Sequence, residues 1–163
     1  MSAFKTYWTT YGGWRSLFLS PYFLFSGLAW AALKPLWFDA FDGSEQSFTW
    51  VEKAIIILPS MVSFSLGALA IFLAFSNETF LKLIRKRGAS DSYLMAAATA
   101  FFHFILIQFV ALALCLFVLA YPVALISGIA FFVFCYALSC GVAAAAAVLD
   151  MAEILNAAGK FDK

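Results

Sequence analysis

The feature that most constrains this chain is a pair of long apolar runs, 93–120 and 122–149, which meet at Tyr121-Pro122. A helix crosses the hydrocarbon core of a bilayer in about 20 residues, so each run is long enough for one span and the two together are too long. Two further apolar runs cover 20–38 and 51–76. The sequence therefore predicts an all-α integral membrane protein, with a four-helix transmembrane bundle that forms a single domain over residues 1–163.

Composition supports the membrane assignment. The chain has 163 residues, of which 65% are hydrophobic and 12% are charged, against about 25% charged in ordinary soluble domains. A soluble protein of this size could not bury so much apolar surface, and a bilayer is its natural solvent. The net charge of +1 creates no overall field for nucleic acid. We expect membrane lipids as partners and no direct contact with nucleic acid.

The distribution of lysine and arginine predicts the orientation. If the N-terminus is cytoplasmic, both termini lie inside and the loop 77–92 and the tail 150–163 face the cytosol, whereas Lys34 and Lys53 lie outside. Cytoplasmic segments are normally enriched in positive charge. This topology assigns eight of the ten Lys and Arg residues to the inside: Lys5, Arg15, Lys82, Arg85, Lys86, Arg87, Lys160 and Lys163. It favours a multi-pass protein of a bacterial-type inner membrane, with short helix extensions into the cytosol.

The N-terminal segment 1–16 carries aromatic residues at helical spacing. Phe4, Tyr7, Trp8 and Tyr11 recur every three or four residues and stop at Gly12-Gly13. Such a pattern is typical of a short helix that lies on the inner membrane surface. The alternative is a disordered chain end.

Two rows of small residues predict close helix contacts, because transmembrane helices pack through small side chains and hydrogen bonds. The span 51–76 carries one row, and the span 122–149 carries the other. Packing inside one chain would explain each row, but two separate rows also favour a homo-oligomer. The first row is Ser60, Ser63, Gly67, Ala70 and Ala74, and the second is Ala137, Gly141 and Ala145.

The third apolar run contains two polar groups that face in different directions. At about 100° per residue, Thr99 and His103 share one helix face, whereas Gln108 lies about 140° away from His103. We therefore expect two different neighbours, one inside the bundle and one at a contact between copies. Chain depth gives Tyr136, Ser139 and Ser65 as candidate partners of His103.

His103 has two interpretations. It could sense protons or line a pore, since histidine titrates near neutral pH. It could instead be a neutral, hydrogen-bonded packing residue. No Asp, Glu, Lys or Arg is expected at mid-membrane to form a proton relay with it. The packing interpretation is therefore favoured.

Signatures of enzymes, metal sites and cofactor sites are missing from the sequence. It has no HExxH, GxSxG or phosphate-loop motif. Cys115, Cys135 and Cys140 all lie in apolar runs without a CxxC pair, which is typical of cysteines that pack as small hydrophobes. We expect no catalytic residue, no metal and no cofactor.

The preferred function is a non-enzymatic, oligomeric membrane anchor or effector. It would dock a cytosolic protein through Lys82, Arg85, Lys86 and Arg87, although the same charges could simply bind anionic lipid. The main alternative is a regulated ion-conducting pore, and a scaffold that only shapes the membrane is a third. In size and in four-span layout the chain is similar to holin-like proteins, superinfection-exclusion proteins and membrane subunits of bacterial defence systems. That layout would fit a defence or stress role, although layout alone carries little functional information.

Overall fold

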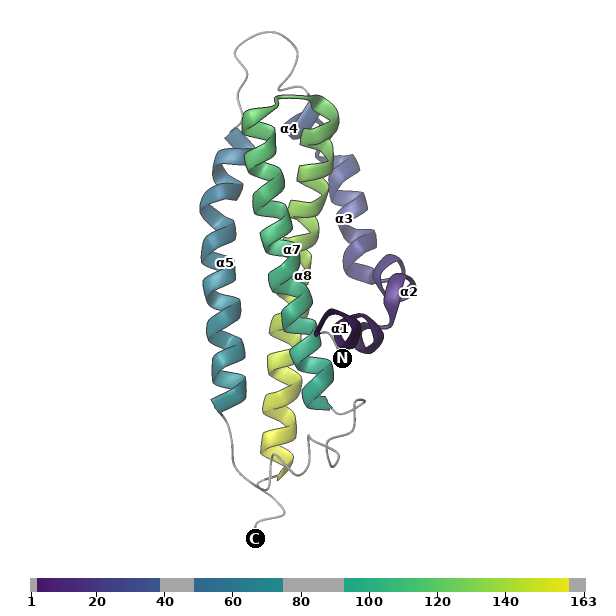
Figure 1. Cartoon of the computed structure of the whole chain (residues 1–163), viewed down its shortest axis with the longest axis vertical. Helices are drawn as coiled ribbons and strands as arrows, with labels where there is room; N and C mark the ends of the chain where they lie inside the picture. Colours follow the sequence, from purple (N-terminus) through teal and green to yellow (C-terminus); the bar gives the residue numbers. More distant parts are fainter. Residues whose placement is uncertain (1–2, 39–48, 75–92, 159–163) are drawn as a thin grey trace.

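The computed structural model describes residues 3–38, 49–74 and 93–158. These residues are helical almost throughout, and within each described range the successive helices are separated by one to three residues (Figure 1). The helices of the described ranges are α1 (Ala3–Tyr11), α2 (Gly13–Phe18), α3 (Pro21–Ala32), α4 (Lys34–Phe38), α5 (Thr49–Ala74), α7 (Tyr93–Ala120) and α8 (Ala124–Ala158).

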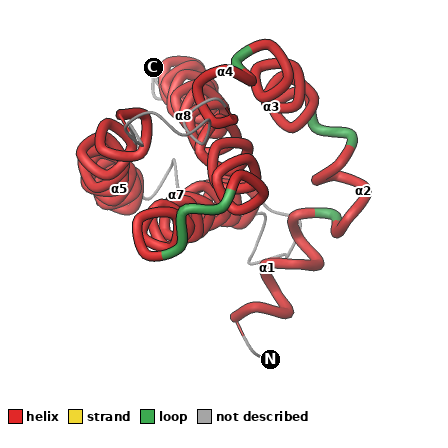
Figure 2. The backbone as a smooth tube through the Cα atoms, turned by 90° about the horizontal axis from the view of Figure 1, so that it is seen from above, coloured by secondary structure: helices red, strands yellow, loops and turns green. Residues whose placement is uncertain are grey.

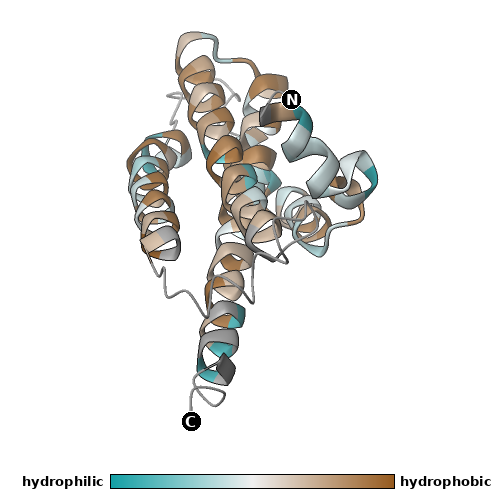
Figure 3. Cartoon of the chain, turned by 60° about the horizontal axis from the view of Figure 1, so that its bottom comes forward, coloured by the Kyte–Doolittle hydropathy of each residue, from teal (hydrophilic) through white to brown (hydrophobic). Residues whose placement is uncertain are grey.

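Three helices are long and apolar enough to cross a membrane. Their apolar stretches run over Thr49–Ile71 in α5, Met95–Ala120 in α7 and Ala124–Asp150 in α8. Figure 3 shows apolar residues along most of these helices and hydrophilic ones near the C-terminal end of α8. The all-α class is confirmed, and so are the bounds predicted for the third span. The helix predicted from 122 begins at Ala124 and continues beyond the apolar stretch to Ala158.

The first predicted span, 20–38, is wrong as a single helix. It is divided at Leu33, where the backbone turns (φ −99°, ψ 24°) before α4 begins at Lys34. Pro35 explains the break, because it has no N–H to donate to the carbonyl of Ala31 four residues earlier, and its ring crowds that carbonyl. At about 1.5 Å per residue, the 12 residues of α3 extend about 18 Å, well short of the roughly 30 Å of a bilayer core.

Helix α8 occupies the middle of the assembly. It contacts α7 on one side and α3 and α4 on the other, and α5 packs mainly on α7. The view from above shows this order directly (Figure 2). The turn between α7 and α8 is tight, since the Tyr121 N–H donates to the Phe117 carbonyl at 2.8 Å and the Val123 N–H donates to the Tyr121 carbonyl at 2.8 Å. Tyr121-Pro122 therefore divides the last two helices as predicted.

An aromatic core lies at the hairpin end of the bundle. Trp30 and Trp37 stack with ring centroids 4.8 Å apart. The indole N–H of Trp30 donates to the Gly128 carbonyl at 2.8 Å, and the indole N–H of Trp37 donates to the Trp30 carbonyl at 2.9 Å. Gly128 allows this approach, because a Cβ there would lie 2.9 Å from the Trp37 ring. These contacts fix α3 and α4 against α8. Buried residues of the same core are Trp50, Val51, Ala54, Leu58, Ala111, Cys115, Val118, Ala130, Phe131, Cys135 and Ala137.

The two rows of small residues have different positions. On α8, Ala137 is fully buried and Gly141 packs against Phe104 and Met61, so that row serves packing inside the chain, although Ala145 at its end is exposed. On α5, the whole row is exposed, and its first residue, Ser60, also borders the groove between α5 and α8. Gly67 lies about 180° around the helix from buried Leu58, and a Cβ added at Gly67 would meet nothing within 4 Å. The exposed row on α5 is Ser60, Ser63, Gly67, Ala70 and Ala74.

Candidate functional site: a buried histidine–tyrosine cluster

His103 is the centre of a buried polar cluster on α7. Only 5% of the residue is exposed. The Tyr7 hydroxyl lies 2.6 Å from its Nδ1, and the Tyr136 hydroxyl lies 2.9 Å from its Nε2. The Tyr11 hydroxyl lies farther away, 3.3 Å from Nε2 and 3.4 Å from the Tyr136 hydroxyl. We refer to Tyr7, Tyr11, His103 and Tyr136 as the histidine–tyrosine cluster.

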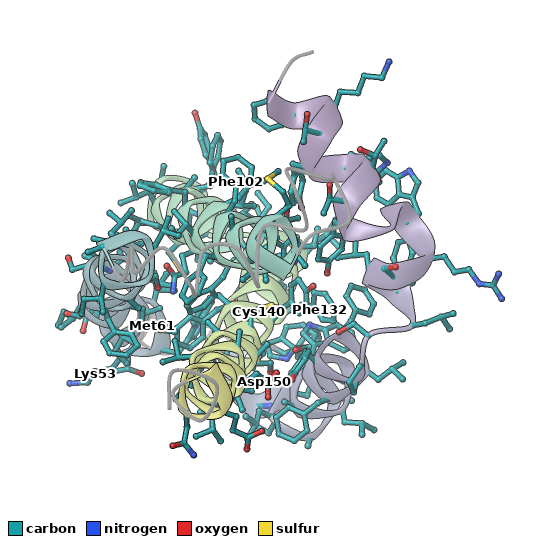
Figure 4. The ribbon with its side chains drawn as sticks, turned by 90° about the horizontal axis from the view of Figure 1, so that it is seen from below. Lys53, Met61, Phe102, Phe132, Cys140 and Asp150 are labelled. Atoms are coloured by element: carbon teal, nitrogen blue, oxygen red, sulfur yellow. The ribbon has the colours of Figure 1, made fainter. Side chains whose placement is uncertain are left out.

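Two of the three tyrosines come from α1, which runs across the side of α7 rather than along it (Figures 1 and 2). The Tyr11 ring stacks on the imidazole with centroids 4.3 Å apart and an interplanar angle of 21°. Tyr7 also packs edge-on against Phe102 at 5.1 Å, and Figure 4 shows Phe102 on the α1 side of α7. Aromatic residues of the N-terminal segment therefore contact the bundle, whereas Phe4 remains mostly exposed. The short helix predicted within residues 1–16 is confirmed as α1, and it ends before Gly12 as the glycine pair predicted.

Gly12 and Gly13 let the chain turn from α1 into α2. Both have positive φ, 90° and 69°, in the left-handed region where residues with a Cβ are strained. A Cβ at Gly12 would also lie 2.3 Å from the Ser16 hydroxyl oxygen. The glycine pair therefore orients α1 so that Tyr7 and Tyr11 reach His103.

The hydrogen bonds of the cluster are consistent with a neutral imidazole, which offers one N–H and one acceptor nitrogen. Burial raises the pKa of Tyr7 to about 12, with a smaller contribution from Tyr11, so its phenol stays protonated near neutral pH. Burial also raises the pKa of Tyr11. We assign Tyr7 as the donor to Nδ1 and Nε2–H as the donor to the Tyr136 hydroxyl. Both ring nitrogens are then satisfied, as buried polar groups require.

The second polar pair, Gln108 and Ser65, joins α7 to α5. The Gln108 amide nitrogen donates to the Ser65 hydroxyl at 3.4 Å, and Ser65 donates to the Met61 carbonyl at 2.6 Å. Gln108 is fully buried, and its Oε1 has no hydrogen-bond partner. His103 and Gln108 do serve different neighbours, as their angular separation predicted. The expectation that one would lie at a contact between copies is not met, because both are buried within one chain.

The other predicted partners of His103 are engaged elsewhere. Ser139 donates to the Cys135 carbonyl at 2.9 Å, and its hydroxyl lies 3.2 Å from that of Ser26 on α3. Ser65 belongs to Gln108. Thr99 is buried, one turn before His103. A Ser139–His103 nucleophilic pair is therefore not formed, whereas Tyr136 is a confirmed neighbour.

Sequence reasoning missed Tyr7 and Tyr11 as partners of His103, and Ser26 as the neighbour of Ser139. Helical spacing did reveal that α1 has an aromatic face, but it could not show which surface that face covers. Lys82, Arg85, Lys86 and Arg87 lie outside the described residues, as do the predicted helical continuation after α5 and the acidic loop after α4. Among the described residues, no group of three or more His, Cys, Asp or Glu could hold a metal ion.

The chain matches no family model, and no curated protein or solved structure matches it either.

Proposed function

We propose that this protein is a non-enzymatic membrane anchor that self-associates through α5 and presents its cytoplasmic face to a soluble partner. The inner membrane, four membrane-embedded segments and cytoplasmic termini are parts of the same proposal. The observation that carries it is the exposed row of small residues on α5, on the opposite side of the helix from the contact with α7.

This row suits contact between copies. Transmembrane helices approach closely where side chains are small, and no hydrophobic force draws them together in lipid. The Ser63 hydroxyl donates to its own helix, to the Pro59 carbonyl at 3.0 Å, so it carries no unmet hydrogen bond into such a contact. A second copy could therefore pack on α5 without burying an unsatisfied polar group.

The position of the intramembrane polar residues supports an anchor over a pore. His103, Gln108, Ser65 and Ser139 are all buried at helix contacts. The groove of about 620 Å³ between α5 and α8 is lined almost entirely by apolar side chains, including Met61, Phe64, Phe104, Leu138 and Val142. A conducting path needs polar or charged lining, and no described residue supplies one within a single chain.

The cytoplasmic face would comprise the basic loop and the end of α8. Helix α8 continues past Asp150 to Ala158, with Asp150 and Glu153 exposed. The loop adds the positive charges Lys82, Arg85, Lys86 and Arg87. The acidic end of α8 and the positive charges of the loop could together bind a soluble protein of mixed charge.

The partner part of the proposal is tested by charge reversal. Arg85, Lys86 and Arg87 would each be replaced by Glu in the full-length protein, and cytosolic proteins that co-purify with it would be compared with those of wild type. We expect partners to be lost while insertion, checked by protease protection of the tail, is unchanged. Retention of every partner would refute docking through the loop.

The self-association part is tested by Gly67→Leu. A bulky side chain on the small face should weaken energy transfer between donor- and acceptor-labelled copies in liposomes. Ala113→Leu is the matched control, since Ala113 is exposed on α7 and lies in neither of the two grooves. Equal energy transfer in wild type and Gly67→Leu would refute the α5 contact.

A regulated, holin-like pore is the second candidate. Ser60 and Ser63 favour it, because their exposed hydroxyls would line a central axis if several copies placed α5 around it. Conduction would then arise only in the oligomer, and ion flux distinguishes the two candidates.

A further inference from the structure

A second groove, of about 690 Å³, lies between α8 and the pair α3 and α4. One end is closed by Phe23 and Phe132, whose rings meet edge to face with centroids 5.0 Å apart. Figure 4 shows Phe132 directed toward the α3 side of α8. The other end is bounded by Trp37 and Phe38 of α4. The volume is within the range of about 300–1,000 Å³ typical of small-molecule sites.

Two glycines shape the wall of this groove. A Cβ at Gly27 on α3 would meet nothing within 4 Å, so the groove is open there. On α8, a Cβ at Gly128 would collide with Trp37, so the indole rests directly on backbone. The groove is therefore a slot between aromatic rings and glycine backbone.

The dimensions suit one acyl chain in one leaflet. The lining residues on α8 extend from Ala124 to Phe132, about 12 Å along a helix axis. One leaflet contributes about half of the roughly 30 Å hydrocarbon core. The lining is apolar, and Leu125 and Ile129 at its edge are 72% and 49% exposed, so the slot opens toward lipid.

A positive charge lies at the α4 end of the slot. The exposed Lys34 ammonium is 4.5 Å from the centroid of the Phe38 ring, and Phe38 lines the groove. If the acyl chain of a lipid lay along the slot toward Phe23, the lipid headgroup would lie at the opposite end, near Trp37 and Phe38. The Lys34 ammonium is at this end. Lysine side chains near a membrane surface attract anionic lipids.

We propose that this groove is a binding site for an anionic phospholipid, with one acyl chain between α3 and α8 and the phosphate beside Lys34. The site adjoins the histidine–tyrosine cluster through Phe23, whose ring packs edge-on against Tyr136 with centroids 5.6 Å apart, and it is separate from the small face of α5. It does not depend on the proposed anchor function.

The test is lipid retention by the full-length protein in native mass spectrometry, with phosphatidylglycerol and phosphatidylcholine of equal chain length added in turn. Wild type should retain phosphatidylglycerol about fivefold better, the factor that one lysine near a membrane surface contributes. Lys34→Gln should abolish this preference. Gly27→Leu should reduce retention of both lipids, because the leucine would fill the slot.

Matched variants control for nonspecific effects. Lys53→Gln removes a positive charge near the same end of the bundle, and Ala113→Leu adds the same side chain at an exposed position on α7; both should retain lipid like wild type. Helicity and thermal melting confirm that each variant is folded.

Four results would overturn the proposal. In the first, wild type retains the two lipids equally, and in the second, Lys34→Gln keeps the preference for phosphatidylglycerol. In the third, inorganic phosphate alone displaces the lipid. In the fourth, Gly27→Leu loses a dimer rather than the lipid. The last result would assign the groove to a second copy. The self-association test on Gly67 is independent, so either proposal can fail alone.

Discussion

Removing the Tyr7 hydroxyl should release α1 from the bundle more often. In Tyr7→Phe, the ring can keep its contact with Phe102 at 5.1 Å, but the 2.6 Å hydrogen bond to His103 Nδ1 is lost. Nδ1 is then a buried acceptor without a partner. Leaving such a group unsatisfied costs about 1–3 kcal/mol.

A cost of about 1–3 kcal/mol changes the ratio of docked to undocked α1 by a factor of about 5–150. Tyr11→Phe should have a smaller effect, since its hydroxyl contacts at 3.3 and 3.4 Å are longer and its ring stacking on His103 remains. The expected order of undocking is therefore Tyr7→Phe, then Tyr11→Phe, then wild type.

Amide hydrogen exchange of residues 3–11 in lipid nanodiscs measures this equilibrium, because exchange of α1 reports local opening. Tyr121→Phe is the control, since Tyr121 is 60% exposed at the α7–α8 turn. Exchange in α1 should accelerate in Tyr7→Phe, with α7 and α8 unchanged. The same α1 exchange in Tyr7→Phe and wild type would refute the role of this hydrogen bond.

Three further substitutions test the packing. Gly128→Ala should displace Trp37 and lower the free energy of unfolding by about 1–3 kcal/mol, measured by reversible denaturation in mixed micelles; an unchanged stability would contradict the close contact. Gln108→Leu should lower the free energy of unfolding by less than about 1 kcal/mol or raise it, because it removes the unpaired Oε1 together with a weak 3.4 Å hydrogen bond. A large loss of stability would show that the contact with Ser65 is strong. Gly12→Ala should accelerate exchange in α1, since φ of 90° costs an L-residue about 1–2 kcal/mol; slower exchange would exclude strain at this turn.

The long helices could be predicted well because their signal is local. Residues 93–120 are apolar apart from a few positions such as Thr99, His103 and Gln108, and the run ends at Tyr121-Pro122; α7 has these bounds. The segment 20–38 forms two helices and not one, because hydropathy alone does not register a backbone break. Pro35 carried that information, since proline removes a hydrogen-bond donor and crowds the carbonyl four residues earlier.

The histidine–tyrosine cluster could be predicted only in part. Tyr136 was within reach by counting depth from the hairpin, because α7 and α8 are antiparallel neighbours. Tyr7 and Tyr11 lie more than 90 residues from His103, and their approach depends on the turn at Gly12. Helical periodicity identifies the aromatic face of α1 but not the surface that it covers.

The small residues show the same limit. Spacing identified the rows on both helices, but only the structure shows that Gly141 packs inside the chain and that Gly67 faces outward. A row of small residues predicts that something approaches closely, and it does not specify the partner.

We infer that the buried polar residues His103, Gln108, Ser65 and Ser139 hold the helices together and do not line an ion path. The most direct test is ion flux from liposomes containing the folded, full-length protein, at about pH 5.5 and about pH 7.5, on either side of the usual histidine range. Wild type and His103→Ala should both show no flux above protein-free liposomes at either pH. Flux that depends on pH and changes in His103→Ala would contradict the claim and establish a pore.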